Sequence, residues 1–157
     1  MKKKFILAGS LVLAAVIAAT LFYIFSPITF GQGVGNIKPE AIVKIQLLDG
    51  TAGTLTETTD PQLIEEIYTE LAPVKLDWKR PVQAAGWSWG VKLYTGEPDD
   101  FVFYTCDHDF LKFGSYAGHV RGGAWYTDTS QTVRQTIIKY YQMLAEAQGE
   151  QPIAPPG

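Results

Sequence analysis

The densest group of potentially reactive side chains lies between residues 106 and 119. Cys106, Asp107, His108 and Asp109 are consecutive, and His119 follows ten residues after Asp109. Imidazole, carboxylate and thiolate groups are the donors that bind zinc and related metals, so Asp107, His108, Asp109 and His119 are weak candidate metal ligands. Their spacing matches no familiar zinc motif, and a solvated turn followed by a loop histidine is the alternative interpretation. The sequence therefore predicts neither a resident metal nor a cofactor.

Cys106 is also a candidate nucleophile, for which His108 or His119 would have to act as the base. It ends the hydrophobic run 101–106, however, and this position favours a small buried core residue. No Gly-x-Ser-x-Gly, Ser-x-x-Lys, His-Glu-x-x-His or dinucleotide-binding motif is present. We therefore predict a non-catalytic protein, and an enzyme or metal-binding protein built on Cys106–Asp109 and His119 stays as the alternative.

Candidate ligand contacts lie in two other places. The glycine-rich segment 114–123 could bind an anion or a small ligand through backbone amides, with charge from Arg121. Its alternative is a bulge or turn near a sheet edge. Tyr94 and Tyr104 lie on the strand faces opposite the predicted core faces, and we expect their side chains to be exposed. The candidate ligand-binding residues are Tyr94, Tyr104, Tyr116, His119 and Arg121.

The tryptophans invite a comparison with sugar-binding surfaces, because aromatic faces stack on sugar rings. Trp87 and Trp89 alternate with small or polar residues and share a strand face with Val91 and Leu93. Such period-two patterning is typical of a core face, whereas an exposed aromatic platform is the other interpretation.

The surrounding elements alternate between strand and helix patterns. Asp49-Gly50 predicts a hairpin turn, and Asp60-Pro61 predicts the start of a helix that ends near Pro73. A second helix is expected from about Ser130 to Ala147. The expected strands are 41–48, 54–58, 74–79, 87–93, 101–106, 110–113 and 124–127. This order predicts an α+β fold, a meandering antiparallel sheet of about five to seven strands with two helices packed on one face.

The N-terminus carries an uncharged run of 21 residues, Phe5–Phe25, directly after Lys2, Lys3 and Lys4. As a helix this run is roughly 31 Å long, which is close to the thickness of the hydrocarbon core of a bilayer. The lysines predict a cytoplasmic N-terminus and an extracytoplasmic domain. We therefore expect a single-pass signal-anchor at 1–25. A cleaved signal that releases a secreted protein and a buried soluble helix are the alternatives.

Three further segments follow the anchor. The glycine-containing stretch 26–39 predicts a flexible stalk, 40–148 the folded domain, and 149–157 a disordered proline-rich tail. Beyond Phe25 the chain has sixteen acidic and ten basic residues, a net charge of about −6. This balance, without a basic cluster larger than Lys79-Arg80, argues against nucleic acid and against charge-driven binding of anionic lipid.

The order of these patterns resembles small extracytoplasmic α+β domains of membrane-anchored proteins from Gram-positive bacteria. The resemblance spans Ala41 to Leu144 and departs from that pattern at 114–123. It implies a binding or sensing module at the cell surface and assigns no functional residue. The residues that carry it are Ile45–Gly50, Thr58–Pro61, Trp87–Tyr94, Gly96, Phe101–Tyr104 and Ala124–Tyr126.

The sequence thus predicts a membrane-anchored, extracytoplasmic, non-catalytic module that binds a protein or a cell-wall ligand. Its membrane contact would run through residues 5–25. A further alternative is an accessory subunit of a membrane complex, because the small residues Ala14-Ala15 and Ala18-Ala19 permit close helix packing.

Overall fold

The computed structural model describes residues 2–79, 86, 88–96, 101–107, 110–115 and 125–149. For residues 2–8, 23, 24, 101–104, 106, 107 and 115 only the backbone is described. The helices are α1 (Lys2–Phe25), α2 (Phe30–Gly33), the 3₁₀ turn η1 (Pro39–Ala41), α3 (Pro61–Leu71) and α4 (Thr132–Ala147). The strands are β1 (Ile28–Thr29), β2 (Lys44–Asp49), β3 (Thr54–Thr58), β4 (Lys75–Lys79), β5 (Trp89–Tyr94), β6 (Phe101–Asp107), β7 (Phe110–Ser115) and β8 (Trp125–Thr127).

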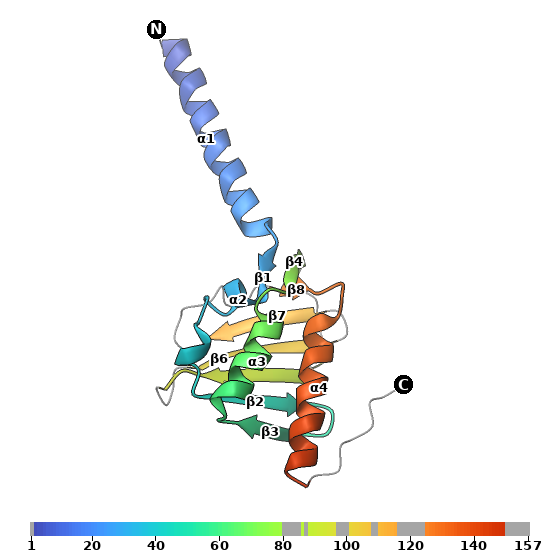
Figure 1. Cartoon of the computed structure of the whole chain (residues 1–157). Coiled ribbons are helices and arrows are strands. Elements are labelled where there is room, and N and C mark those ends of the chain that lie inside the picture. The colour runs from blue at the N-terminus through green and yellow to red at the C-terminus, as the bar shows by residue number, and fades with distance from the viewer. Residues whose placement is uncertain are drawn as a thin grey trace.

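All these strands join one antiparallel sheet in the order β1-β4-β8-β7-β6-β5-β2-β3. Helices α3 and α4 cross one face of it (Figure 1). The predicted α+β class with an antiparallel sheet and helices is therefore confirmed. The described residues form eight strands, more than the expected five to seven, because the N-terminal segment adds β1.

The start of α3 follows the local signals in the sequence. Asp60 accepts a hydrogen bond from the Gln62 amide at 2.9 Å, and Pro61 occupies the first helical position. Ile64, Ile67 and Leu71 are buried beneath the helix, as their spacing predicts. The hairpin turn after β2 is likewise closed by Asp49, whose Oδ1 accepts from two amides of the turn.

The core lies between the sheet and the two helices. Alternate sheet residues Ile45, Leu47, Val91 and Leu93 are essentially buried, and Trp89 is 6% exposed. The core interpretation of Trp89 is confirmed, whereas Trp87 lies outside the described residues. Val43, which directly precedes β2, is 51% exposed.

The predicted stalk is corrected by the structure, which packs much of this segment into the domain. Ile28 and Thr29 pair with Leu76 and Lys75, which makes β4 an inner strand of the sheet. Phe30 is 0% exposed and Val34 1% exposed. Gly31 and Gly33 do not act as a flexible spacer, because they allow α2 to lie close against Ala72 and Phe113.

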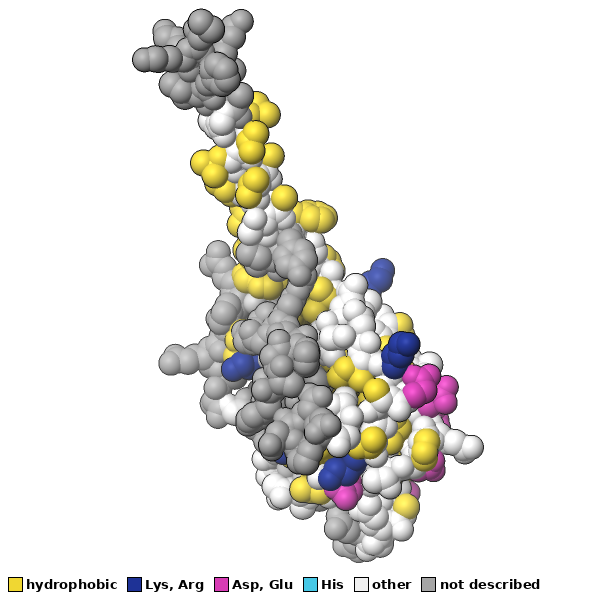
Figure 2. All heavy atoms as spheres, turned by 90° about the vertical axis from the view of Figure 1, so that its left-hand side faces the viewer, with side chains coloured by type: hydrophobic (Ala, Val, Ile, Leu, Met, Phe, Trp, Pro, Cys, Tyr) yellow, Lys and Arg dark blue, Asp and Glu magenta, His cyan; other side chains and the backbone are white. Residues whose placement is uncertain are grey.

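Helix α1 extends away from this domain (Figure 1). Its described side chains are mostly hydrophobic and exposed, and Figure 2 shows them above the domain. Phe25, the last residue of α1, contacts Trp78 edge to face with ring centroids 4.4 Å apart. Within the part of the chain that the structure describes, no helix combines the length and apolarity needed to cross a membrane.

Candidate functional site

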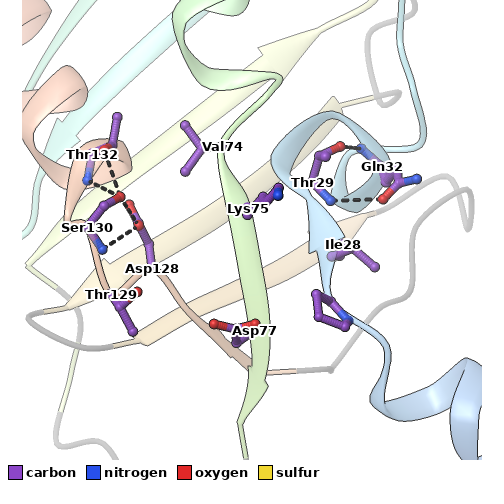
Figure 3. A pocket seen from close by; sticks show the side chains of 11 residues that line it. Ile28, Thr29, Gln32, Val74, Lys75, Asp77, Asp128, Thr129, Ser130 and Thr132 are labelled. Atoms are coloured by element: carbon purple, nitrogen blue, oxygen red, sulfur yellow. Dashed lines mark hydrogen bonds between the residues drawn. The ribbon is translucent and has the colours of Figure 1, made fainter.

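An open groove runs along β4 at the end of the domain that adjoins α1. Its volume is about 540 Å³, and its walls come from segments far apart in the sequence. Residues of the 128–132 loop lie on one side of β4, and Thr29 and Gln32 lie on the other (Figure 3). The lining residues are Pro27, Ile28, Thr29, Gln32, Val74, Lys75, Asp77, Asp128, Thr129, Ser130 and Thr132.

The 128–132 wall is shaped by the buried carboxylate of Asp128. Its Oδ2 accepts from the Val133 amide at 2.8 Å, and its Oδ1 accepts from the amide and hydroxyl of Ser130. Asp128 thereby holds the first turn of α4, while Gln131 at the helix start has a left-handed φ of 55°. These three contacts give Asp128 a structural role, which is to position this wall of the groove.

The opposite wall is held by a reciprocal capping box. The Thr29 amide donates to Gln32 Oε1 at 2.8 Å, and the Gln32 amide donates to Thr29 Oγ1 at 3.2 Å. This exchange closes the first turn of α2, and Figure 3 shows the two side chains turned toward each other.

Lys75 and Asp77 place opposite charges on β4 between these walls. Both side chains are exposed, and neither has an ion-pair partner among the described residues. Residues two apart on a strand share a face, so the ammonium and the carboxylate are available to the same ligand. The surrounding hydroxyl and amide groups add donors and acceptors to a lining that is otherwise more apolar than polar, so the groove suits a ligand with both polar and apolar parts.

Asp128 should therefore stabilise both α4 and the groove. We expect Asp128→Ala to lower the free energy of unfolding by about 1–2 kcal/mol, because it removes a helix cap and leaves a buried amide without its acceptor. Urea denaturation of the full chain in detergent measures this change. Asp77→Ala is the matched control, because it removes an exposed carboxylate. It should change the free energy of unfolding by less than about 0.5 kcal/mol. Equal effects of the two substitutions would contradict the capping role.

Of the predicted ligand-binding residues, Tyr94 alone has a side chain that the structure describes. It is half-buried, and its hydroxyl donates to Gln46 Oε1 at 2.8 Å. The Lys44 ammonium lies 4.4 Å from its ring centroid. Tyr94 thus belongs to a network on the outer sheet face and does not line the groove on β4.

The other predicted site residues are described only in part or not at all. Tyr104 pairs in register with Val91 and Phe113, both buried, whereas Tyr94 pairs with Lys44 and Phe101. The backbones of Tyr104 and Tyr94 therefore occupy positions on opposite faces of the sheet. Tyr116, His108, Asp109, His119 and Arg121 lie outside the described residues.

Cys106 and Asp107 are described through their backbone alone. Both belong to β6, and Cys106 stands in register with the buried residues Trp89 and Leu111. Among the residues that the structure describes, no three His, Cys, Asp or Glu side chains are grouped so as to hold a metal ion. The metal and nucleophile hypotheses for this cluster stay predictions.

A second polar cluster joins α3 to α4. The hydroxyl of the buried Tyr140 lies 2.8 Å from Glu70 Oε1 and 2.9 Å from Glu66 Oε1. Lys139 donates to the same Glu70 oxygen at 2.6 Å. Burial, followed by the hydrogen bonds to the two carboxylates, raises the pKa of Tyr140, and the hydrogen bonds from Lys139 and Tyr140 lower the pKa of Glu70. These contacts tie two helices together and do not line the β4 groove.

The raised pKa of Tyr140 makes stability depend on alkaline pH. The unfolded phenol ionises near pH 10, while the folded one stays neutral to higher pH. The free energy of unfolding should therefore fall as the pH rises above about 10. Tyr140→Phe should show a shallower fall between about pH 9 and 11, measured by urea denaturation at each pH. Parallel curves for the wild type and the variant would contradict this assignment.

Several groove residues went unnoticed in the sequence. Thr29-x-x-Gln32 has the spacing of a capping box and could have been found from that pattern. Lys75 and Asp77 carry no local signal of their own, since alternating charges are common on strands.

No family model matches the sequence, and comparisons with curated proteins and with solved structures also returned no match.

Proposed function

We propose that this chain is a membrane-anchored extracytoplasmic binding module, with Phe5–Phe25 as its anchor and the β4 groove as its ligand site. The observation that carries the proposal is the junction of α1 with the domain. The apolar helix α1 leads through β1 directly into the sheet, and the open groove lies beside that junction. The proposed span includes 5–8, 23 and 24, of which only the backbone is described.

The composition of α1 supports the orientation. Lys2, Lys3 and Lys4 precede the uncharged run, which favours a cytoplasmic N-terminus and an external domain. A protease added to intact bacterial cells should digest the domain and leave a short membrane-embedded fragment. Protection of the domain in intact cells, or its release from membranes by alkaline carbonate, would contradict the anchored topology.

The groove chemistry supports a polar ligand of the cell envelope. Its hydroxyls, amide groups and two opposite charges match a ligand with sugar hydroxyls and a peptide that carries both amine and carboxylate groups. Soluble peptidoglycan fragments are therefore the first probe, because they combine a glycan with such a peptide. Binding would be non-catalytic, since Asp128 is committed to capping and the groove offers no activated nucleophile among its described residues.

A two-dimensional amide spectrum of the full chain in nanodiscs tests this site. Addition of peptidoglycan fragments should shift the amides of Thr29, Gln32 and residues 129–132. Lys75→Gln should weaken the response at least about threefold, whereas Lys38→Gln, which removes an exposed lysine outside the groove, should not. A well-dispersed spectrum without shifts in these segments would remove the groove as the site for this ligand.

A further inference from the structure

Four residues from three neighbouring strands form a cluster on the sheet face opposite α3 and α4. We call Lys79, Phe110, Lys112 and Trp125 the lysine–aromatic patch. Trp125 pairs in register with Lys79 on β4 and Lys112 on β7, so these three share a face. The next pair along, Leu111 and Tyr126, is buried, which assigns the patch to the outer face.

The side chains of the patch pack against one another. The rings of Phe110 and Trp125 meet edge to face, with centroids 6.0 Å apart. The Lys79 ammonium lies 4.2 Å from the Phe110 centroid, and the Lys112 ammonium lies 5.4 Å from the Trp125 centroid. Neither lysine has an ion-pair partner among the described residues. The patch therefore presents two positive charges and two aromatic rings on a domain whose overall charge is negative.

The patch lies near the end of α1. Phe25 contacts Trp78, which stands in register with Tyr126 on the buried face of the sheet, and Lys79 is the next residue of the same strand. In the sheet order, β4 and β8 follow β1 directly, and β3 lies at the far end (Figure 1). Trp125 lies two strands from β1 and, through Lys79, three residues along β4 from the partner of Ile28, which places it about 14 Å from β1. The Lys112 ammonium extends from β7 over this tryptophan ring, so both charges lie in the half of the sheet that adjoins β1.

We propose that the lysine–aromatic patch contacts anionic phospholipid headgroups of the leaflet from which α1 emerges. This inference rests on the proposed membrane anchoring by α1. Tryptophan favours the membrane interface, and basic side chains near a membrane are attracted to anionic lipid. The contact would fix how the domain stands on the bilayer, with Lys75 and Asp77 of the groove further along the same face of β4. It revises the expectation from net charge, because Lys79 and Lys112 become neighbours only in the folded sheet.

Lysine footprinting of the full chain tests the contact without any substitution. The chain is placed in nanodiscs of pure phosphatidylcholine or with 30% phosphatidylglycerol and labelled briefly with an amine-acylating reagent, and mass spectrometry follows each lysine. We expect Lys79 and Lys112 to react about threefold more slowly in the anionic discs, and high salt to reduce this protection. Lys44 is the internal control, because it also lies over a tyrosine ring but belongs to β2, far along the sheet.

The outcomes separate the two proposals. Failure of the chain to enter nanodiscs would overturn the membrane anchoring itself. Insertion with equal labelling of Lys79 and Lys112 in both lipids would overturn the headgroup contact alone, whether they are protected in both or in neither. As a second measurement, brominated anionic lipid should quench the tryptophan fluorescence of the Lys79→Gln/Lys112→Gln variant less than that of Lys44→Gln, since Trp78 beside Phe25 stays near the bilayer in both. Equal quenching in both variants would also count against the contact.

Discussion

Replacement of Phe30 by alanine should lower the free energy of unfolding by about 3–5 kcal/mol, because it empties a fully buried site. The Phe30 ring is 0% exposed and lies 5.7 Å from the Phe113 ring, centroid to centroid. A loss of that size is a large share of the stability of an ordinary domain. Urea denaturation of the full chain in detergent, followed by tryptophan fluorescence, measures it.

Phe30→Ala distinguishes a flexible stalk at residues 26–39 from a segment that is packed into the core. If residues 26–39 were a spacer, Phe30→Ala would change stability by no more than about 0.5 kcal/mol. Val43→Ala is the matched control, since it also truncates an apolar side chain of the following segment, but one that is half exposed. We expect this control to remain within about 0.5 kcal/mol of the wild type. Similar small effects of both variants would contradict the packed arrangement.

Replacement of Gly33 by alanine should also destabilise the domain, here by about 1–3 kcal/mol through overpacking. A Cβ at Gly33 would lie 2.3 Å from Cζ and 2.5 Å from Cε2 of Phe113. Phe113 is itself fully buried against Phe30 and Tyr126, so its ring has little room to move. The same denaturation experiment measures the loss.

A double-mutant cycle identifies the cause of this loss. Phe113→Leu removes the ring atoms that the new methyl group would meet, so the double variant should be more stable than the sum of the two single changes implies. Gly86→Ala is the matched control, because none of the described residues lies within 4 Å of a Cβ at Gly86. Additive effects in the cycle, or an equal loss in the control, would rule out the contact with Phe113 as the reason.

Local chemistry made much of the fold predictable. A hairpin turn at Asp49, a helix capped by Asp60 and the buried stripe of α4 each depend on residues within a few positions of one another. For the same reason the alternation around Trp89 indicated a core face correctly. The uncharged run Phe5–Phe25 is another such local signal, and its meaning for the membrane stays a prediction.

The candidate surfaces depended on contacts between distant segments and were not predictable in this way. In the sequence, Gly31 and Gly33 indicated a flexible stalk. Sequence alone does not distinguish a glycine that permits close packing from one that permits motion. Only the pairing of β1 with β4 distinguishes the two. That pairing also brings Thr29 to one side of β4, opposite the loop after β8 (Figure 3).

The sequence by itself determined the fold class, the main helix starts and the long apolar N-terminal run, because each is written in residues that are neighbours along the chain. The tertiary structure decided which of these elements meet. It placed Phe30 in the core, formed the groove from three separate segments, and brought Lys79 beside Phe110 and Lys112 beside Trp125. Such meetings follow from strand order and register, which are fixed by burial of the whole sheet face rather than by any local pattern.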